Sequence, residues 1–297
     1  MPLIPRTSKN PPSGRARRRQ SESWAPAAPL LVFTALVFGV PALAIAVCAF
    51  TRTDPATGAT SFTTANIVGS LHGAYLTSLL ASLKLSAGAA AISAVAGTAL
   101  AWAVVTCRVR QIRNAVLTAS GVLANFGGVP LAFAFVATLG NSGLLTRALG
   151  LDTLGWSLYG FWGMTVTYLY FLVPLMVLTV TPALDGLRTQ WSEAARNNGA
   201  TTLRYWWHVA LPVLTPSLAG GFVLLFGSAF AAYATAAAMG GGSLPLVTLR
   251  IADALSGNVL VGQENVALAL SLNMILIAGL VMAVYLPLQR RSTRWLT

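Results

Sequence analysis

Charged residues are scarce in this sequence. Asp, Glu, Lys and Arg make up 9% of its 297 residues, whereas the apolar set AVILMFWYC makes up 56%, and the mean hydropathy is +0.70. Because a soluble domain carries about 25% charged residues, this composition argues against an ordinary soluble domain. Cysteine is nearly missing too, and the two residues present, Cys48 and Cys107, exclude a disulfide-rich scaffold.

The residue combinations that carry enzyme chemistry are missing as well. The two histidines, His72 and His208, fall in different loops, and no His/Cys cluster has the spacing of a metal site. The motifs G-x-S-x-G and H-E-x-x-H do not occur. Neither lysine, Lys9 or Lys84, follows a phosphate-binding glycine loop. We therefore predict no catalytic residue, no metal site and no cofactor in this chain.

Long apolar runs, in contrast, are abundant. A helix that crosses the hydrocarbon core needs about 20 mostly apolar residues, and six stretches meet this requirement. We predict an all-α, polytopic membrane protein in which residues 27–288 form one domain between a basic disordered tail (1–26) and a short tail (289–297). The six predicted spans cover residues 27–50, 85–106, 115–139, 158–181, 213–237 and 266–288.

The basic residues predict how these spans are oriented. Six spans place both termini on one side, and fifteen basic residues fall in the tails and loops of that side. The opposite loops hold three, Arg52, Arg147 and Arg250, and Lys84 lies within or beside the second span. The positive-inside rule then predicts a plasma-membrane protein with both termini in the cytoplasm. This asymmetry accounts for the net charge of +12 without a nucleic-acid partner, and the Arg-rich N-terminal tail is expected to face lipid.

Carboxylates are missing from the predicted spans, since all acidic residues lie in the loops or tails. Ion-coupled transporters commonly use intramembrane acids. Their absence argues against an ion-coupled secondary transporter, which is the alternative function for this chain. A structural or assembly protein is a further alternative, but it does not explain helix breaks inside the spans.

Breaks are expected in two spans. The third span contains Asn125-Phe-Gly-Gly-Val-Pro130 and the fourth contains Pro174, and broken helices occur at membrane depth only where the backbone lines a cavity or is buried. Small residues at every fourth position, from Ala89 to Ala101 and from Gly227 to Thr235, predict closely packed helices. Polar and aromatic side chains at membrane depth are candidates for a translocation path, with an interhelical contact as the alternative for each. These candidates are Asn125, Phe126, Tyr168, Tyr170, Tyr233 and Asn273.

The cytoplasmic loop 182–212 has the pattern of two short helices. Apolar residues at i, i+4, i+7 and i+8 from Leu187 form one helix face. Gly199 follows as a stop signal suited to a left-handed position. A second short helix is expected next, with Thr201 or Thr202 as its N-cap. The loop therefore predicts a rigid protrusion, with an amphipathic connector on the lipid surface as the alternative.

The same loop carries a recognisable motif. Glu193-Ala194-Ala195 is followed after three residues by Gly199, and after nine more by the segment Val209-x-Leu211-Pro212. This pattern resembles the EAA loop of binding-protein-dependent ABC importer permeases. Every spacing is kept, Val209 replaces the usual isoleucine, and Asn198 replaces the leucine usual before the glycine. Segments 143–149, 168–178 and 239–242 look like the spermidine/putrescine branch, whose features are shared by ferric-iron, thiamine and 2-aminoethylphosphonate permeases.

The resemblance implies a type I importer fold and a set of partners. These are a second permease or a copy of this chain, two ATP-binding subunits that would bind ATP and Mg²⁺, and an extracytoplasmic solute-binding protein. The implied cargo is a small solute of the polyamine-like, phosphonate, iron or thiamine class. In the family the EAA helices couple the permease to the ATPase, so the resemblance assigns this role to Glu193, Ala194, Ala195, Gly199, Val209, Leu211 and Pro212.

Overall fold

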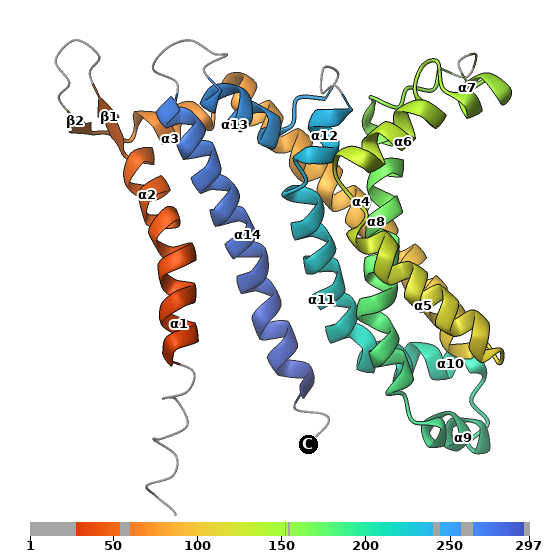
Figure 1. Cartoon of the computed structure of the whole chain (residues 1–297). Helices are drawn as coiled ribbons and strands as arrows, with labels where there is room; N and C mark the ends of the chain where they lie inside the picture. Colours follow the sequence, from red (N-terminus) through yellow and green to blue (C-terminus); the bar gives the residue numbers. More distant parts are fainter. Residues whose placement is uncertain are drawn as a thin grey trace, which may run out of the picture.

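The computed structural model describes residues 28–53, 60–151, 153, 155–239, 244–256 and 264–293. The predicted N-terminal tail and the segment 240–242 lie outside these residues, as does the end of the C-terminal tail. The described chain is helical apart from one small hairpin (Figure 1). Its elements are α1 (Ala28–Thr34), η1 (Ala35–Gly39), α2 (Val40–Ala49), β1 (Thr51–Thr53), β2 (Thr60–Phe62), α3 (Ala65–Ser70), α4 (Gly73–Thr106), α5 (Arg110–Asn125), α6 (Val129–Leu139), α7 (Leu144–Ala148), α8 (Phe161–Asp185), α9 (Thr189–Asn197), α10 (Thr202–Tyr205), η2 (Trp206–Ala210), α11 (Leu211–Phe230), α12 (Ala234–Ala238), α13 (Val247–Leu255) and α14 (Glu264–Thr293).

Six helical stretches of the described chain are long and apolar enough to cross a membrane, which confirms the predicted number. They are Ala28–Ala49, Gly73–Thr106, Val129–Ala148, Phe161–Asp185, Thr202–Phe230 and Asn265–Pro287. The predicted start of the second span at residue 85 is wrong, because the helix continues outward past the exposed Lys84 to Gly73. A charged residue lowers hydropathy without ending a helix, so apolar length underestimates such a span.

The third span differs most from its prediction. Residues 115–139 do not form one helix, because α5 ends at Asn125 and α6 begins at Val129. Gly128 between them adopts φ +79°, which only glycine adopts readily, and Pro130 occupies the first turn of α6. The expected break at Asn125–Pro130 is therefore present, and it separates α5, which packs along α8, from α6, which turns away at one end of the bundle (Figure 1).

The fifth span and the loop before it also have other boundaries than predicted. A single helix runs through α10, η2 and α11 from Thr202 to Phe230, so the span begins eleven residues before residue 213. It ends at Phe230, not at residue 237, because the chain unwinds at residues 231–233 before α12. Pro182 lies inside α8, which continues to Asp185. Of the predicted loop 182–212, the part that lies outside the two long helices is therefore α9 with the short connection on each side of it.

The all-α prediction omitted one element, an antiparallel hairpin of β1 and β2. Its register pairs Thr51 with Phe62, and the Phe50 and Phe62 rings stack at a centroid distance of 5.8 Å. This hairpin and the short helices α3, α7, α12 and α13 gather at one end of the bundle (Figure 1). The opposite end holds the start of α1, the α4–α5 turn, α9 and the end of α14, as the predicted alternation of six spans requires (Figure 1).

The core of the bundle is the pair α4 and α8. Ala89, Ala101 and the residues Ser93 and Gly97 between them are buried. A Cβ atom at Gly97 would lie 2.5 Å from the Met176 Cβ atom, so the two backbones approach as closely as their small residues allow. The predicted packing face of the second span is confirmed. The corresponding prediction for Gly227, Ala231 and Thr235 is wrong, since the helix ends before Ala231 and Gly227 faces open space.

Candidate functional site

The glycine of the EAA pattern closes helix α9 with two hydrogen bonds. The Gly199 N–H donates to the Arg196 carbonyl oxygen at 2.9 Å, and the Ala200 N–H donates to the Ala195 carbonyl oxygen, also at 2.9 Å. Gly199 itself has φ +73°. Together these features make a Schellman motif, in which a left-handed residue satisfies the last carbonyl groups of a helix. The predicted left-handed glycine is therefore present, and it sets the direction in which the chain leaves α9.

A new helix begins three residues after Gly199, at Thr202. Thr201 is the N-cap, and its Oγ1 accepts from the Arg204 N–H at 3.3 Å, which selects Thr201 over Thr202 as the predicted cap. No break separates this helix from the span, because α10, η2 and α11 are continuous through Val209, Leu211 and Pro212. The expected second short helix is therefore the first three turns of one long helix.

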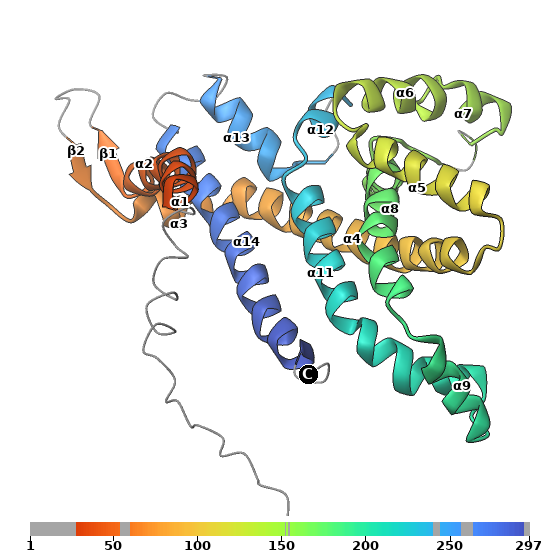
Figure 2. The same ribbon diagram turned by 60° about the horizontal axis from the view of Figure 1, so that its bottom comes forward.

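The EAA side chains are presented outward. Glu193 and Ala194 are exposed, and Ala195 is half-buried. Trp191, one turn earlier, is half-buried and lies under the Arg188 guanidinium at 5.9 Å. Figure 2 shows α9 projecting beyond the ends of α8 and α11. The helix thus offers a small surface on which Glu193 and Ala194 are accessible.

Two helix breaks meet at the other end of α11. The Gly128 N–H donates to Thr235 Oγ1 at 3.0 Å, which joins the α5–α6 break to the start of α12. The Tyr168 hydroxyl donates to the Ala232 carbonyl oxygen at 3.2 Å and so holds the unwound segment 231–233 against α8. Thr235 was not singled out from the sequence as a functional residue. The bundle has an irregular region here that is fixed by side-chain hydrogen bonds to backbone.

The six path candidates do not converge on one point. Asn125, Phe126 and Tyr233 are exposed at the two breaks, and Asn125 Nδ2 donates to the Gly121 carbonyl oxygen of its own helix at 2.9 Å. Tyr168 is buried at its contact with Ala232. The remaining two make interhelical contacts elsewhere. Tyr170 meets Phe135 of α6 edge to face at a centroid distance of 5.8 Å, and Asn273 Nδ2 donates to Ser70 Oγ of α3 at 2.8 Å.

An open cavity that the sequence did not indicate lies between α8, α11 and α14. Its volume is about 690 Å³. Along α11 the lining includes Ser217, Gly221, Leu224 and Ser228, whose spacings of three and four place them on one helix face. Four lining residues contribute hydroxyl groups: Thr179, Ser217, Ser228 and Tyr285. The α11 side of the cavity also contains three residues without a side chain, Gly220, Gly221 and Gly227. Tyr285 bridges two walls, since its hydroxyl lies 3.4 Å from the Pro216 carbonyl oxygen, which it can bond. The other side chains that line the cavity are apolar, namely Val223, Leu224, Phe226, Ala278, Val281 and Met282.

Acidic, cysteine and histidine side chains do not form a metal site in the part of the chain that the structure describes. No group of three or more of them comes together there. Of the Lys, Arg, Asp and Glu side chains in the described spans, Lys84 is the one that lies away from a span end, and it is exposed.

Comparison with known proteins gives a family match. The family described as "Binding-protein-dependent transport system inner membrane component" matches residues 129–294, which is more than half of the chain. The molybdenum transport system permease protein ModB of Mycobacterium tuberculosis is 26% identical over 217 residues, covering 69% of this chain and 76% of that protein.

Two other relatives match over a shorter region. The sulfate permease protein CysT of Salmonella typhimurium is 38% identical over 68 residues, and the spermidine/putrescine permease protein PotC of Escherichia coli is 34% identical over 67 residues. Each of these matches covers 23% of this chain, and the chain spans about a quarter of each of these two proteins. All three relatives are named as transport permeases, and their names differ in solute.

Solved structures share the fold. A bacterial ABC transporter that imports alginate matches with a TM-score of 0.68 and 15% identity, over 93% of this chain and 98% of that chain. The MetNI methionine ABC transporter matches with a TM-score of 0.51 and 17% identity, over 73% of this chain and 97% of that chain. The predicted type I importer fold is confirmed. With the family match over α6 to α14, these findings identify the chain as a multi-pass membrane protein of the binding-protein-dependent transport system inner membrane component family, the permease subunits of ABC importers.

Proposed function

We propose that this chain is one permease of an ATP-driven importer and that α9, with the helix that follows it, transmits movement from a separate ATP-binding subunit. The observation that carries this proposal is the EAA helix itself. It is exposed, it projects from the bundle, and a Schellman motif at Gly199 fixes its end. Glu193, Ala194 and Ala195 would meet the ATPase, while Val209, Leu211 and Pro212 would pass the movement on.

The continuity of the helix from Thr202 to Phe230 supports this role. Its 29 residues span about 43 Å at 1.5 Å per residue. The helix is continuous from Val209 to Phe230, with Pro216 inside it, so a displacement applied near Val209 would pass along it toward residues 231–233. There the Tyr168 hydrogen bond connects the unwound segment to α8, and the Thr235 hydrogen bond connects the following helix, α12, to the α5–α6 break. One continuous helix thus joins the proposed docking surface to the irregular end of the bundle.

The α11 face that lines the 690 Å³ cavity is the translocation surface in this proposal. Asn125, Phe126 and Tyr233 stand exposed at its far end, where the two breaks meet. A second permease, or a copy of this chain, would close the open side. The path is permissive, because the described spans supply hydroxyl groups and no carboxylate apart from Asp185 at the end of α8, so selection among small solutes would rest mainly with an extracytoplasmic binding protein. The polyamine-like, phosphonate, iron and thiamine classes fit this proposal, and the named relatives add sulfate and molybdenum.

The proposed orientation places α9 in the cytoplasm. Six arginines of the described chain lie in α5, α9, α10 or the adjoining connections at this end, whereas Arg52, Arg147 and Arg250 lie at the other. In a variant that lacks Cys48 and Cys107, a cysteine at position 196 should resist an impermeant thiol reagent added to intact cells. A cysteine at the exposed Asn141 should react. The reverse pattern would invert the topology.

The docking proposal is tested by photo-crosslinking. A photoreactive amino acid at Ala194 should yield a crosslink to the ATP-binding subunit in the assembled complex, and the yield should change when ATP is added. The same amino acid at Asn141, in the connection between α6 and α7 at the opposite end of the bundle (Figure 1), is the control and should yield none. A complex that hydrolyses ATP and imports solute, yet gives no crosslink from Ala194, would show that α9 is not the docking element.

A further inference from the structure

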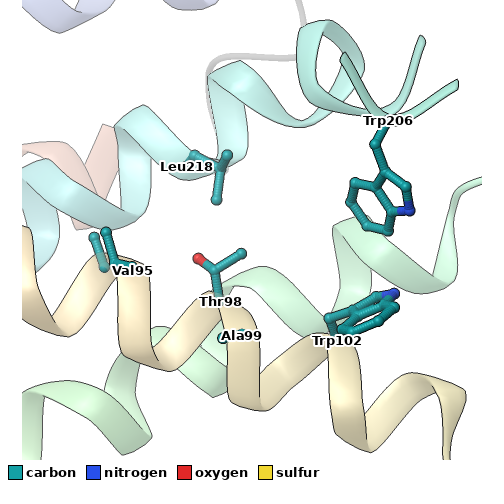
Figure 3. A pocket seen from close by; sticks show the side chains of 7 residues that line it. Val95, Thr98, Ala99, Trp102, Trp206 and Leu218 are labelled. Carbon is teal, nitrogen blue, oxygen red and sulfur yellow. The ribbon is translucent and has the colours of Figure 1, made fainter. Parts of the chain in front are cut away.

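A second hollow lies on a different side of α11, in the half of the bundle nearest to α9. It is an open groove of about 540 Å³ between α4 and the α10–η2–α11 helix. Six of its seven lining side chains are apolar or aromatic, and Thr98 provides the one hydroxyl (Figure 3). The complete lining is Ala94, Val95, Thr98, Ala99, Trp102, Trp206 and Leu218. Such a surface suits hydrocarbon and not a polar solute.

Two tryptophans close the groove at the end nearer to α9. Trp102 of α4 and Trp206 of η2 meet edge to face, with centroids 5.8 Å apart and planes at 90°. Figure 3 shows both indole nitrogens on the side of the rings away from Val95 and Leu218. Tryptophan prefers the membrane–water boundary, where the ring contacts acyl chains and the N–H group meets the headgroup region. The pair therefore marks the boundary of one leaflet.

The length of the groove fits one acyl chain. From Ala94 to Trp102 the α4 axis rises about 12 Å, and half of a 30 Å hydrocarbon core is about 15 Å. A chain that enters beside the tryptophans would follow α4 and reach Val95 near the middle of the bilayer. A partner helix, in contrast, would be expected to continue past both ends of the groove.

The charge beyond the tryptophan pair is positive. Arg108 follows the end of α4 by two residues, and Arg204 precedes Trp206 by two residues in the same continuous helix, so each lies close in the sequence to one of the two groove tryptophans. Both side chains are exposed. The described acidic residues at this end are Asp185, which is paired with Arg113, and Glu193 on α9. A phosphate headgroup at the mouth would thus meet unopposed arginine.

We propose that this groove binds an anionic phospholipid, with one acyl chain between α4 and α11 and its phosphate near Arg204 and Arg108. One wall of the groove belongs to the continuous helix that begins directly after the EAA turn. The lipid would therefore fill the space between this helix and α4. The lipid site depends on the membrane topology but not on ATPase docking, so either assignment can fail without the other.

The test uses tryptophan fluorescence of the assembled complex in nanodiscs of 20% phosphatidylglycerol and 80% phosphatidylcholine. Brominated acyl chains quench tryptophan on contact, and the same molar amount of bromine is placed either on the phosphatidylglycerol or on the phosphatidylcholine. Quenching should be stronger with brominated phosphatidylglycerol. In Arg204→Gln this preference should fall about fivefold, which is the enrichment expected from one arginine at a membrane surface.

A matched pair of substitutions separates the groove from the general lipid surface. Ala99 lines the groove and Ala96, also exposed on α4, does not. Ala99→Phe should abolish the preference for brominated phosphatidylglycerol, whereas Ala96→Phe should retain it. Equal quenching by the two lipids in the unmodified complex, or an unchanged preference in Ala99→Phe, would overturn the proposal. Absence of quenching by either lipid would show that a partner subunit covers the groove, which overturns it equally.

Discussion

The helix pair α4–α8 and the helix pair α11–α14 are packed very differently. In α8, 61% of the most apolar 18-residue stretch is buried, against 22% in α14. Between α4 and α8 the backbones touch through Gly97, where a Cβ atom would lie 2.5 Å from Met176 Cβ. Between α11 and α14 lies the 690 Å³ cavity, and Gly227 has no atom within 4 Å of its Cβ position.

This difference suggests separate roles for the two pairs: α4 and α8 hold the fold together, and α11 and α14 border the proposed translocation path. Close packing of small residues gives α4 and α8 one well-defined arrangement. The α10–η2–α11 helix, which begins after the EAA turn and ends at the unwound segment 231–233, borders the open cavity. Segments that move in a mechanism come from the less stable parts of a fold. We therefore expect substitutions to act on folding in the first pair and on transport in the second.

The largest effect is expected at Gly97. Gly97→Leu would drive a side chain into Met176 and the Val173 carbonyl oxygen, which lies 2.9 Å from the Cβ position. We predict a loss of stability above about 3 kcal/mol and little folded complex after purification. Gly227→Leu is the matched control, because its Cβ position is open. It should fold normally and reduce uptake by narrowing the cavity, as thermal unfolding and reconstituted uptake would show. Comparable folding defects in both variants would contradict the contrast between the two pairs.

An intermediate effect is expected at Thr235. Thr235→Val removes the acceptor of the Gly128 N–H and leaves that group without its partner, at a cost of about 1–3 kcal/mol. Thr215→Val is the control, because the Thr215 hydroxyl bonds only within its own helix, to the Leu211 carbonyl oxygen at 2.7 Å. We predict a lower unfolding temperature and slower uptake for Thr235→Val alone. If the two variants behave alike, the two breaks are not joined by this hydrogen bond.

The smallest effect is expected at the ion pair of Arg113 and Asp185, which connects the ends of α5 and α8. Both side chains are about one-third exposed, so the pair contributes below about 1 kcal/mol. Arg113→Gln should lower the unfolding temperature slightly, and the difference should shrink as salt is added. Arg110→Gln, on the same helix, is the comparison. A large, salt-independent effect of Arg113→Gln would mean that the pair holds the frame together.

Much of the frame could be predicted from the sequence, because the bilayer imposes a length and composition on each span. The number of spans, the break at Asn125–Pro130 and the small-residue face of α4 were all predicted, and the structure contains them. The prediction failed where a helix passes through a polar residue without ending. The charge of Lys84 interrupted the apolar run, so the outer part of α4 was not predicted. The residues that extend α11 back to Thr202 were not counted because they are not part of a continuous apolar run.

The functional regions divide in the same way. The EAA turn could be predicted because its conformation is local, since a left-handed glycine and a nearby cap suffice to form it. The cavity between α8, α11 and α14 and the Thr235–Gly128 hydrogen bond could not, because they join residues that are distant in the sequence. For the same reason Tyr170 and Asn273, chosen for polarity at membrane depth, lie in interhelical contacts away from the breaks.

The most direct test of the account is to disturb the EAA turn alone. Gly199 has φ +73°, so Gly199→Val places a β-branched residue in a conformation that costs about 1–3 kcal/mol. Gly186, at the other end of the same loop, has φ −73° and is the control as Gly186→Val. In reconstituted complex of equal subunit content, we predict that Gly199→Val abolishes uptake and solute-stimulated ATP hydrolysis while Gly186→Val preserves both. Normal uptake by the Gly199→Val complex would contradict the assignment of α9 as the coupling helix.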